Sequence, residues 1–151
     1  MSTHAILLVE DNEDDVFLMK RAMRVAGITN PLHIAEDGQA AIDYLAGTGA
    51  YADRTQAPLP MIVVLDLKLP YKSGHEVLEW IRQQPNFETL VVIVLTSSSE
   101  QVDLDRAYKL GANSFVVKPP TTALLQGLVE SFKLWWLTHN QAAIKPAPHA
   151  A

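Results

Sequence analysis

Five short apolar runs separated by helical patterns constrain the fold of this chain more than any other feature of its sequence. The runs cover residues 5–9, 32–35, 61–65, 91–95 and 114–117, and most of them are rich in β-branched residues. The third and fourth runs show no alternation of apolar and polar residues, which indicates strands that are covered on both faces. The pattern therefore predicts a parallel β-sheet with helices on either side.

The segments between these runs carry apolar residues at helical spacing. The clearest set, at i, i+3, i+4 and i+7, consists of Met19, Ala22, Met23 and Ala26. Gly27 and Gly111 stand where two of the helices should end, because glycine is common just beyond a helix. Five β–α units in succession predict one α/β domain of the doubly wound (βα)5 type, with five parallel strands in the order 2-1-3-4-5.

Composition argues against several classes of function. The chain has 151 residues, a size that suits about one domain. Its net charge of −5 provides no positive field for nucleic acid or anionic lipid, and its lack of cysteine excludes disulfides and thiolate metal sites. The first apolar run is too short for a secretion signal or a membrane span, so we expect a cytoplasmic protein that binds no membrane. Residues 1–139 should form the domain, and residues 140–151, rich in Ala and Pro, a disordered tail.

Polar side chains directly follow four of the five predicted strands. Since the carboxyl ends of parallel strands meet at one edge of a sheet, we expect these side chains to converge there. They are Glu10 and Asp11 after the first strand, Asp66 after the third, Thr96 and Ser97 after the fourth, and Lys118 after the fifth, where Pro119 comes next.

A cluster of three carboxylates needs a cation, because otherwise each carboxylate would disfavour the ionised form of the others. Oxygen ligands with no His or Cys nearby favour a hard ion, and a site with open positions suits Mg²⁺ better than Ca²⁺. Mg²⁺ and Lys118 would balance the charges of Glu10, Asp11 and Asp66. In such a pocket Asp66 is the natural nucleophile toward a phosphoryl group, since a carboxylate can form an acyl phosphate.

Four short motifs stand at these strand ends. They are Leu-Val-Glu-Asp-Asn at 8–12, Leu-Asp-Leu-Lys-Leu-Pro at 65–70 with Gly74 beyond it, Leu-Thr-Ser at 95–97, and Phe-Val-Val-Lys-Pro at 115–119. Together they resemble the receiver domain of two-component response regulators over about residues 4–135, and this resemblance implies the flavodoxin-like receiver fold. It also implies that Asp66 accepts a phosphoryl group from a phosphohistidine of a sensor histidine kinase.

The same resemblance implies how the pocket binds its ligands. Asp11 would bind Mg²⁺ directly, Glu10 through water, and Lys68 through its backbone carbonyl, while Asp66 would contact the ion as well. The residues implied to bind the phosphoryl oxygens are Thr96, Ser97 and Lys118.

A conformational switch is a further implication of the resemblance. On phosphorylation Thr96 would move toward the phosphoryl group, and Phe115 would turn inward to fill the space that Thr96 leaves. These movements would remodel the face formed by the fourth helix, the fifth strand and the fifth helix. The peptide bond between Lys118 and Pro119 would be cis, which proline permits. The chain departs from the commoner pattern in having Glu10 for Asp and Phe115 for Tyr, so a readout through a phenolic hydroxyl is not available.

A narrower resemblance is to the small stand-alone regulators that pair with bacterial phytochrome-type histidine kinases. It rests on residues 47–53, which lie in a long connection over 47–60, on Leu-Lys-Leu-Pro at 67–70, and on the aromatic end of the last helix. This resemblance implies a light-sensing kinase as the phosphodonor. We expect no output domain, so that the signal would pass by protein contact or by onward phosphotransfer.

The last helix contains more apolar residues than one buried stripe can use. If a stripe of five apolar residues faces the sheet, four others are surplus, and some of these four must lie outside that stripe. The stripe is Leu125, Leu128, Val129, Phe132 and Trp136, and the surplus residues are Leu124, Leu134, Trp135 and Leu137. Clustered aromatic and leucine side chains at a surface indicate an interface. We therefore expect a homodimer through the face of the fourth helix, fifth strand and fifth helix, with Leu134 and Trp135 as contacts. The alternative is a longer helix that packs these residues against the domain.

Three other functions stay open on the sequence. A receiver-like scaffold would bind partners without phosphorylation. A phosphatase of the haloacid dehalogenase type would also use an Asp, a Lys and Mg²⁺, but its motif has a second Asp where this chain has Lys68. A flavin-binding protein of the same fold would need a hydroxyl- and glycine-rich loop after the first strand, where this chain is acidic. The receiver resemblance favours a signalling phosphoacceptor over a classical enzyme, although a receiver catalyses its own phosphotransfer and slow dephosphorylation.

Overall fold

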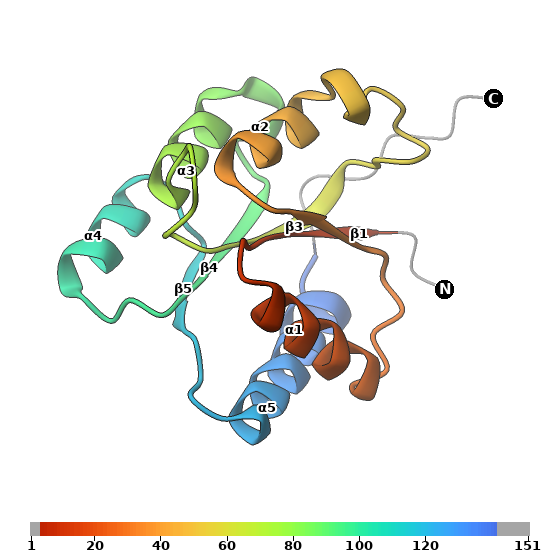
Figure 1. Ribbon diagram of the computed structural model, residues 1–151, viewed down its shortest axis with the longest axis vertical. Coiled ribbons are helices and arrows are strands. Elements are labelled where there is room, and N and C mark those ends of the chain that lie inside the picture. Colours follow the sequence, from red (N-terminus) through yellow and green to blue (C-terminus); the bar gives the residue numbers. More distant parts are fainter. Residues whose placement is uncertain (1–3, 142–151) are drawn as a thin grey trace.

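The five apolar runs form the strands of one parallel sheet (Figure 1). The computed structural model describes residues 4–141. Its strands are β1 (Ala5–Val9), β2 (Leu32–Ala35), β3 (Pro60–Leu65), β4 (Val91–Thr96) and β5 (Ser114–Val117). Their order, β2-β1-β3-β4-β5, confirms the predicted doubly wound topology. β3 begins one residue earlier and β4 ends one residue later than the apolar runs predict.

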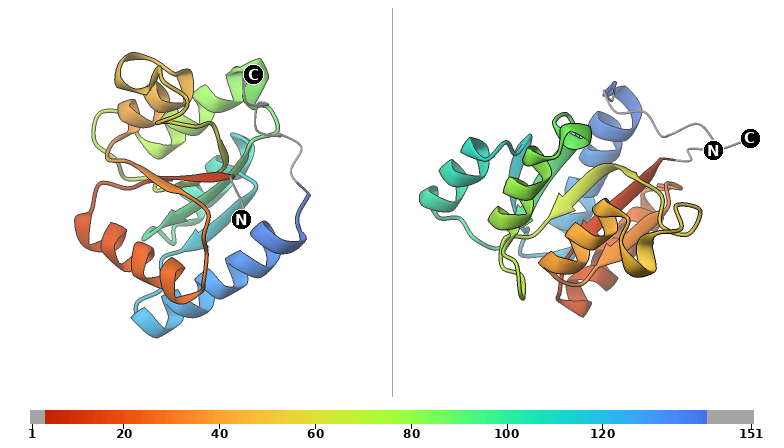
Figure 2. Two further views of the ribbon diagram at one scale, coloured as in Figure 1. Left: turned by 90° about the vertical axis from the view of Figure 1, so that its right-hand side faces the viewer. Right: turned by 90° about the horizontal axis from the view of Figure 1, so that it is seen from above.

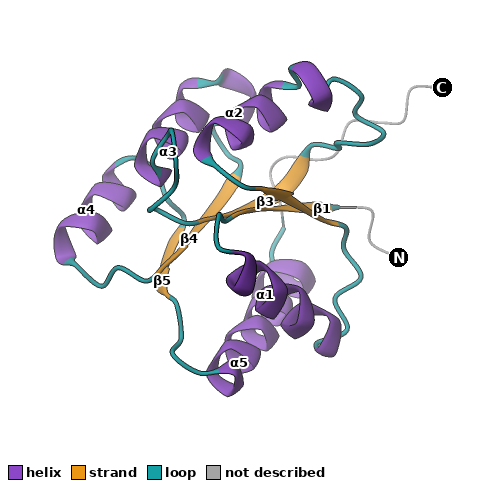
Figure 3. Cartoon of the chain, in the orientation of Figure 1, coloured by secondary structure: helices purple, strands orange, loops and turns teal. Residues whose placement is uncertain are grey.

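Helices cover both faces of this sheet (Figures 2 and 3). One layer consists of α1 (Glu13–Val25) and α5 (Thr122–Phe132), and the other consists of α2 (Gly38–Ala46), α3 (Gly74–Gln83) and α4 (Gln101–Lys109). Shorter helical turns are η1 (Gly49–Tyr51) and η2 (Pro85–Phe87), and α5 continues into the π-helix η3 (Lys133–His139). The predicted βα alternation is therefore complete within the described residues.

Alternate residues of each central strand pack into opposite apolar layers. Leu7 and Val63 belong to the core beneath α2, α3 and α4, whereas Ile6 and Ile62 belong to the core beneath α1 and α5. All four side chains are buried, which explains why the third and fourth runs of the sequence show no polar residues. A sheet that is buried on both faces exposes only its ends, so the carboxyl end of the sheet is the place for a site.

The long connection over 47–60 is held against the end of α2 by one arginine. Arg54 Nη1 donates hydrogen bonds to the carbonyl oxygens of Tyr44 at 2.6 Å and Ala57 at 3.1 Å, and its Nη2 donates to Leu45 O at 2.8 Å. The Tyr44 hydroxyl donates to Pro58 O at 2.8 Å. The guanidinium thus joins the carbonyl groups at the end of α2 to the carbonyl of Ala57 in the loop, and this gives the loop a structural role.

The π-helical turn after α5 changes which apolar residues are exposed. Leu134 and Trp135 are 59% and 64% exposed, as expected for residues outside the buried stripe. Leu137 packs with Trp136 against the apolar layer of α1 and α5, so Leu137 is not one of the surplus residues that lie outside the buried stripe. The reason is the wider turn, in which Asn140 N bonds to Trp135 O, five residues earlier, at 2.8 Å.

The boundary expected at residue 140 stays a prediction, because residues 142–151 of the expected tail lie outside the described residues. Over residues 4–141, none of the helices has the length and apolar character needed to span a bilayer.

Candidate functional site

An open acidic cavity of about 490 Å³ lies at the carboxyl end of the sheet, beside β1 and β3. Its position matches the point where the strand order reverses, where ligands bind in folds of this type. The cavity is lined by Glu10, Asp11, Asn12, Glu13, Asp14, Asp15, Asp66, Ser97 and Lys118. The segments that follow β1, β3, β4 and β5 all contribute to it, as the sequence predicts.

Three of the lining carboxylates lie close enough to share a metal ion. Glu10, Asp11 and Asp66 each offer one carboxylate oxygen, and these oxygens lie within 4.8 Å of one another. Glu10 and Asp66 are buried, and Asp11 is exposed. Oxygen donors that are partly open to solvent fit a hard divalent cation that keeps some of its water. The side chain of Lys68 is exposed, and the role implied for its backbone carbonyl stays a prediction.

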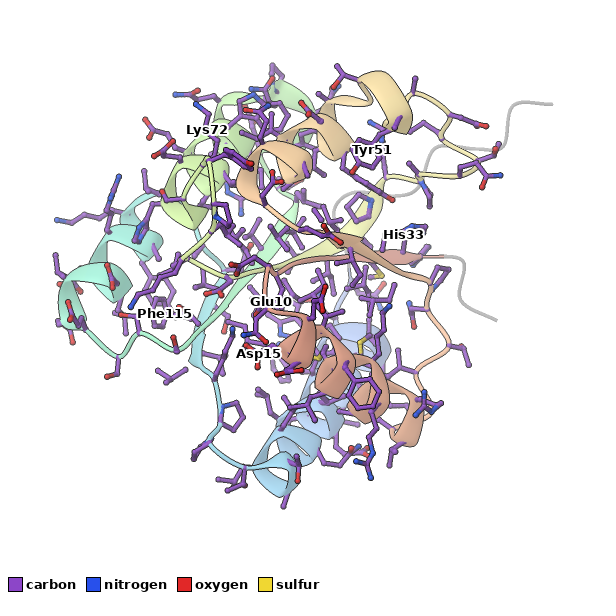
Figure 4. The ribbon with its side chains drawn as sticks, viewed as in Figure 1. Glu10, Asp15, His33, Tyr51, Lys72 and Phe115 are labelled. Carbon is purple, nitrogen blue, oxygen red and sulfur yellow. The ribbon has the colours of Figure 1, made fainter. Side chains whose placement is uncertain are left out.

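Lys118 joins the carboxylates of the cavity through its ammonium group. Its Nζ donates hydrogen bonds to Glu10 Oε1 at 2.5 Å, Asp15 Oδ2 at 2.9 Å and Asp66 Oδ2 at 3.2 Å. Figure 4 shows Glu10 and Asp15 near one another between β1 and the first turn of α1. Each carboxylate that Lys118 contacts is therefore oriented toward the same point in the cavity.

Asp15 belongs to the cavity although it does not stand at a strand end and was not predicted from the sequence. The helix cap contains the signal that could have found this residue, because Asn12 precedes α1 and accepts a hydrogen bond from Asp15 N at 3.0 Å. This cap places Asp15 in the first turn of a helix whose start borders the cavity. A carboxylate there interacts favourably with the helix dipole and can reach a cation in the cavity.

Burial and charge compete at the two most enclosed ionisable groups of this cluster. Burial raises the pKa of Glu10 to about 7, and the charge of Asp66 adds to the rise, while the hydrogen bond from Lys118 opposes it. Burial alone would lower the pKa of Lys118, but its hydrogen bonds to Asp15 and Glu10 and the nearby carboxylate charges outweigh burial and raise it. Lys118 therefore stays charged, and the cavity retains an excess of negative charge that favours a cation.

Asp66 is fixed by contacts on both sides of its carboxylate. Its Oδ1 accepts a hydrogen bond from Leu67 N at 2.7 Å, and its Oδ2 accepts from Lys118 Nζ at 3.2 Å. The start of α3 packs against the same backbone, where Gly74 N donates to Leu67 O at 2.8 Å. A Cβ atom on Gly74 would lie 2.2 Å from Asp66 O, so only glycine allows this approach.

The structure separates the two hydroxyl residues that follow the core of β4. Ser97 is exposed and lines the cavity. Thr96 is fully buried and is not among the lining residues, and its Oγ1 accepts a hydrogen bond from Ser98 N at 3.4 Å. In this arrangement Ser97 is the hydroxyl residue at the cavity, and Thr96 would have to move to reach a ligand in it.

β5 and the loop after it contain two of the residues singled out in the sequence, Phe115 and Pro119. Phe115 is partly buried and packs against the core beneath α2, α3 and α4. The expected cis bond before Pro119 was wrong, because no peptide bond between residues 4 and 141 is cis. Lys118 reaches the carboxylates with a trans bond, since its backbone is held by the hydrogen bond from Lys118 N to Thr96 O at 2.7 Å. The trans form is also the favoured form of an isolated X–Pro bond.

Comparisons with known proteins agree with this geometry. Residues 6–130 match the family model of the response regulator receiver domain. The chain is 40% identical over 140 residues to the probable methanogenesis regulatory protein FilR2 of Methanothrix harundinacea, covering 91% of this chain and 86% of FilR2. It is 36% identical over 132 residues to the response regulator Rcp1 of Synechocystis, covering 87% of this chain and 88% of Rcp1.

Solved structures of response regulators have the same fold. The phosphorylated cyanobacterial phytochrome response regulator RcpA matches with a TM-score of 0.88 and 31% identity, over 95% of this chain and 100% of RcpA. The Mn²⁺-bound form of Rcp1 matches with a TM-score of 0.84 and 33% identity, over 93% of this chain and 99% of that structure. The family model covers most of the domain, and the relatives match over nearly their whole length. The chain therefore belongs to the receiver-domain family of two-component response regulators, which are signalling proteins, and its relatives include phytochrome response regulators.

Proposed function

We propose that this protein is a phosphorylatable switch in which Asp66 accepts a phosphoryl group from a sensor histidine kinase, with Mg²⁺ in the acidic cavity. The observation that carries the proposal is the meeting of Glu10, Asp11 and Asp66 within 4.8 Å, with Lys118 bonded to two of them. Because these residues come from the ends of β1, β3 and β5, their convergence depends on the whole sheet. The existence of a Mn²⁺-bound form of the similar protein Rcp1 supports a divalent ion as the ligand.

The phosphoryl transfer is a displacement at phosphorus. A carboxylate oxygen of Asp66 forms a bond to phosphorus as the bond from the phosphohistidine nitrogen to phosphorus breaks, and the released imidazole takes up a proton from solvent. The product is an acyl phosphate. Mg²⁺, when bound by Glu10, Asp11 and Asp66, neutralises charge on the phosphoryl oxygens. The contact of Asp66 Oδ1 with Leu67 N keeps the carboxylate oriented during this step.

Lys118 and the hydroxyl residues would bind the transferred group. Lys118 Nζ, which now contacts three carboxylates, would exchange one of them for a phosphoryl oxygen. Ser97 already lines the cavity and can donate a hydrogen bond to a second oxygen. Thr96 would move out of its buried position to a third oxygen, and partly buried Phe115 would take the space it leaves. This exchange would carry the signal to the face of α4, β5 and α5.

The phosphodonor that we propose is a kinase of the phytochrome type. Similarity to RcpA and Rcp1 supports this choice, since RcpA is named as a phytochrome response regulator. FilR2, which is more similar in sequence, is named for the regulation of methanogenesis. The test measures the rate of phosphotransfer to this protein from two purified kinases, a bacterial phytochrome kinase and a histidine kinase without a phytochrome module. A faster rate from the phytochrome kinase is the expected result, and a faster rate from the other kinase would contradict this choice of donor.

The proposal is tested by intact mass after incubation with acetyl phosphate. We expect the wild-type protein to gain one phosphoryl group in the presence of Mg²⁺ and none in EDTA. Asp66→Asn should gain none, because an amide cannot form the acyl phosphate. Asp105→Asn changes an exposed carboxylate of α4 that accepts a hydrogen bond from Gln101, away from the cavity, and it should behave like the wild type. Absence of any gain in the wild type would instead favour the phosphorylation-independent scaffold.

A homodimer is the second part of the proposal. The exposed Leu134 and Trp135 lie beside an apolar hollow of about 200 Å³ whose lining includes Val116 of β5. Val117 is exposed at the same edge of the sheet. A second copy that covers this face would remove these apolar side chains from water, with the face of α4, β5 and α5 contacting itself across a two-fold axis.

A further inference from the structure

Two buried polar residues behind the cavity take no part in the chemistry proposed above. Ser98, in the loop between β4 and α4, is 7% exposed, and His75, at the start of α3, is 6% exposed. Both contact the same residue, Asp103 in the first turn of α4. We name Ser98, Asp103 and His75 the α4 latch.

The hydrogen bonds of the latch fix the first turn of α4. Ser98 Oγ donates to Asp103 Oδ2 at 2.5 Å and also accepts from Glu100 N at 3.3 Å. Glu100 stands at the N-cap of α4 and makes no capping bond with its own side chain, and Ser98 pairs the backbone amide of this N-cap residue. His75 Nε2 lies 3.2 Å from Asp103 O, and because a carbonyl only accepts, this nitrogen is the donor.

The latch contacts both sides of the cavity. On one side, Ser98 N donates to Thr96 Oγ1 at 3.4 Å and so holds the switch hydroxyl in its buried position. On the other side, His75 follows Gly74, which packs directly on the backbone of Asp66 and Leu67. A continuous path of contacts therefore runs from Asp66 through α3 and α4 to Thr96, behind the cavity.

We propose that the α4 latch stabilises the phosphoryl-free conformation and that Ser98, Asp103 and His75 act as positioning residues for Thr96. This inference rests on the proposed function. Thr96 cannot reach the cavity without breaking its hydrogen bond to Ser98 N, and any shift of the loop strains the bond from Ser98 to Asp103. The latch thus opposes the conformation that accepts the phosphoryl group, and its loss should increase the population of that conformation.

The test compares initial rates of phosphorylation by acetyl phosphate at saturating Mg²⁺. Ser98→Ala and Asp103→Ala should each raise the rate about tenfold, the factor by which losing one charge-assisted hydrogen bond shifts a two-state equilibrium. The double variant should be no faster than Ser98→Ala, because the bond that Asp103→Ala removes is already absent in that variant. The Mg²⁺ concentration for half-maximal rate should stay unchanged, since no latch residue lines the cavity.

Two further variants separate positioning from loss of structure. Asp103→Asn retains an oxygen that accepts from Ser98 Oγ, so its rate should lie between the wild type and Asp103→Ala. Asp105→Ala removes an exposed carboxylate from the same helix and should leave the rate unchanged. If Asp103→Ala does not fold, the comparison between Ser98→Ala and Asp103→Asn decides the question.

The phosphorylation rates separate a failure of the latch proposal from a failure of the proposed function. Equal or lower rates in Ser98→Ala and Asp103→Asn, with normal Mg²⁺-dependent phosphorylation of the wild type, would overturn the latch and leave Asp66 as the acceptor. Additive effects in the double variant would also overturn the latch. A wild-type protein that never gains a phosphoryl group would overturn both proposals.

Discussion

Lys118 contacts residues that lie far away from it in the sequence. Its three carboxylate partners are 52, 103 and 108 positions distant, and Glu10 and Asp66 are almost completely enclosed. Within residues 4–141, its ammonium is the cation that forms ion pairs with these carboxylates. One side chain therefore pairs with three carboxylates of the metal-free protein, and the function we propose assigns the same side chain to a phosphoryl oxygen.

Loss of this cation should destabilise the metal-free protein. Lys118→Met should lower the free energy of unfolding in EDTA by roughly 1–3 kcal/mol, because buried carboxylates lose their partner. Added Mg²⁺ should restore part of the loss, as measured by urea unfolding. Lys72→Met is the matched control, since it breaks an exposed ion pair of 4.0 Å with Glu76 and should change stability by less than about 0.5 kcal/mol.

Lys118 also tests the link between phosphorylation and the switch. We expect Lys118→Met to take up some phosphoryl group from acetyl phosphate while its assembly state stays the same with and without the donor. Intact mass and sedimentation velocity on the same samples measure the two effects. A phosphorylated variant whose assembly still responds to the donor would show that Lys118 is not needed for coupling.

Tyr44 gives a prediction for alkaline pH. Burial raises the pKa of its hydroxyl from 10.0 to about 12. Since the folded state holds this proton more tightly, the contribution to stability is fully present below pH 10 and is lost as pH rises through 12. Urea unfolding across this range should show the loss in the wild type and a smaller one in Tyr44→Phe. At neutral pH that variant should be less stable by about 1 kcal/mol, because the hydrogen bond to Pro58 O is absent.

At the scale of elements, the site depends on how closely helix starts approach the strand ends. α1 begins at the cap Asn12, directly after the acidic pair that follows β1, and its first turn brings Asp15 to Lys118. α3 begins at the cap Ser73 and rests on the backbone of Asp66. The helix starts therefore position the carboxylates, and a change that moves a helix should disturb the site without touching a charged residue.

A substitution at Gly74 measures how strongly the site depends on the position of α3. Gly74→Ala should destabilise the protein by several kcal/mol and reduce phosphorylation, because the new Cβ would meet Asp66 O at 2.2 Å and neither backbone can move freely. Gly127→Ala in α5 meets nothing within 4 Å and should stabilise the protein by up to about 1 kcal/mol through helix propensity. Thermal unfolding of both variants measures these two changes in stability. Equal changes in the two variants would show that α3 does not pack closely on the backbone of Asp66.

In the molecule as a whole, the end of the α1 and α5 layer exposes large apolar side chains of η3. An apolar hollow beneath this layer, lined by residues of all five strands, is bordered by Trp135 and Trp136, and Leu134 beside them is exposed. Clustered exposed apolar side chains of this kind favour association in water. The proposed dimer explains why η3 directs two large apolar residues outward while it packs two others inward.

Two charge substitutions, one on the proposed dimer face and one on α1, test the dimer. Trp135→Glu should convert the dimer to a monomer in sedimentation velocity, since a buried unpaired charge opposes the contact. Phe17→Glu replaces an equally exposed aromatic residue on α1 and should leave the dimer intact. A wild-type monomer in both the phosphorylated and unphosphorylated states would contradict the dimer itself.

The sequence by itself determined the five strands, their order and the end of the sheet at which polar residues gather. These features follow from local periodicity and from the geometry of βα units, so the positions of Glu10, Asp66 and Lys118 at strand ends could be read from one chain. Their roles in phosphoryl transfer remain a proposal that the sequence and the geometry support together.

The packing of the folded chain sets how individual side chains turn and pair. It turned Thr96 away from the cavity toward Ser98, paired Asp15 with Lys118, kept the bond before Pro119 trans, and packed Leu137 inward through the π-helical turn. Each outcome depends on contacts between residues distant in sequence, or on a hydrogen-bond pattern that a 3.6-residue period does not describe. Local pattern thus specifies which residues reach the edge of the sheet, and packing selects their conformations there.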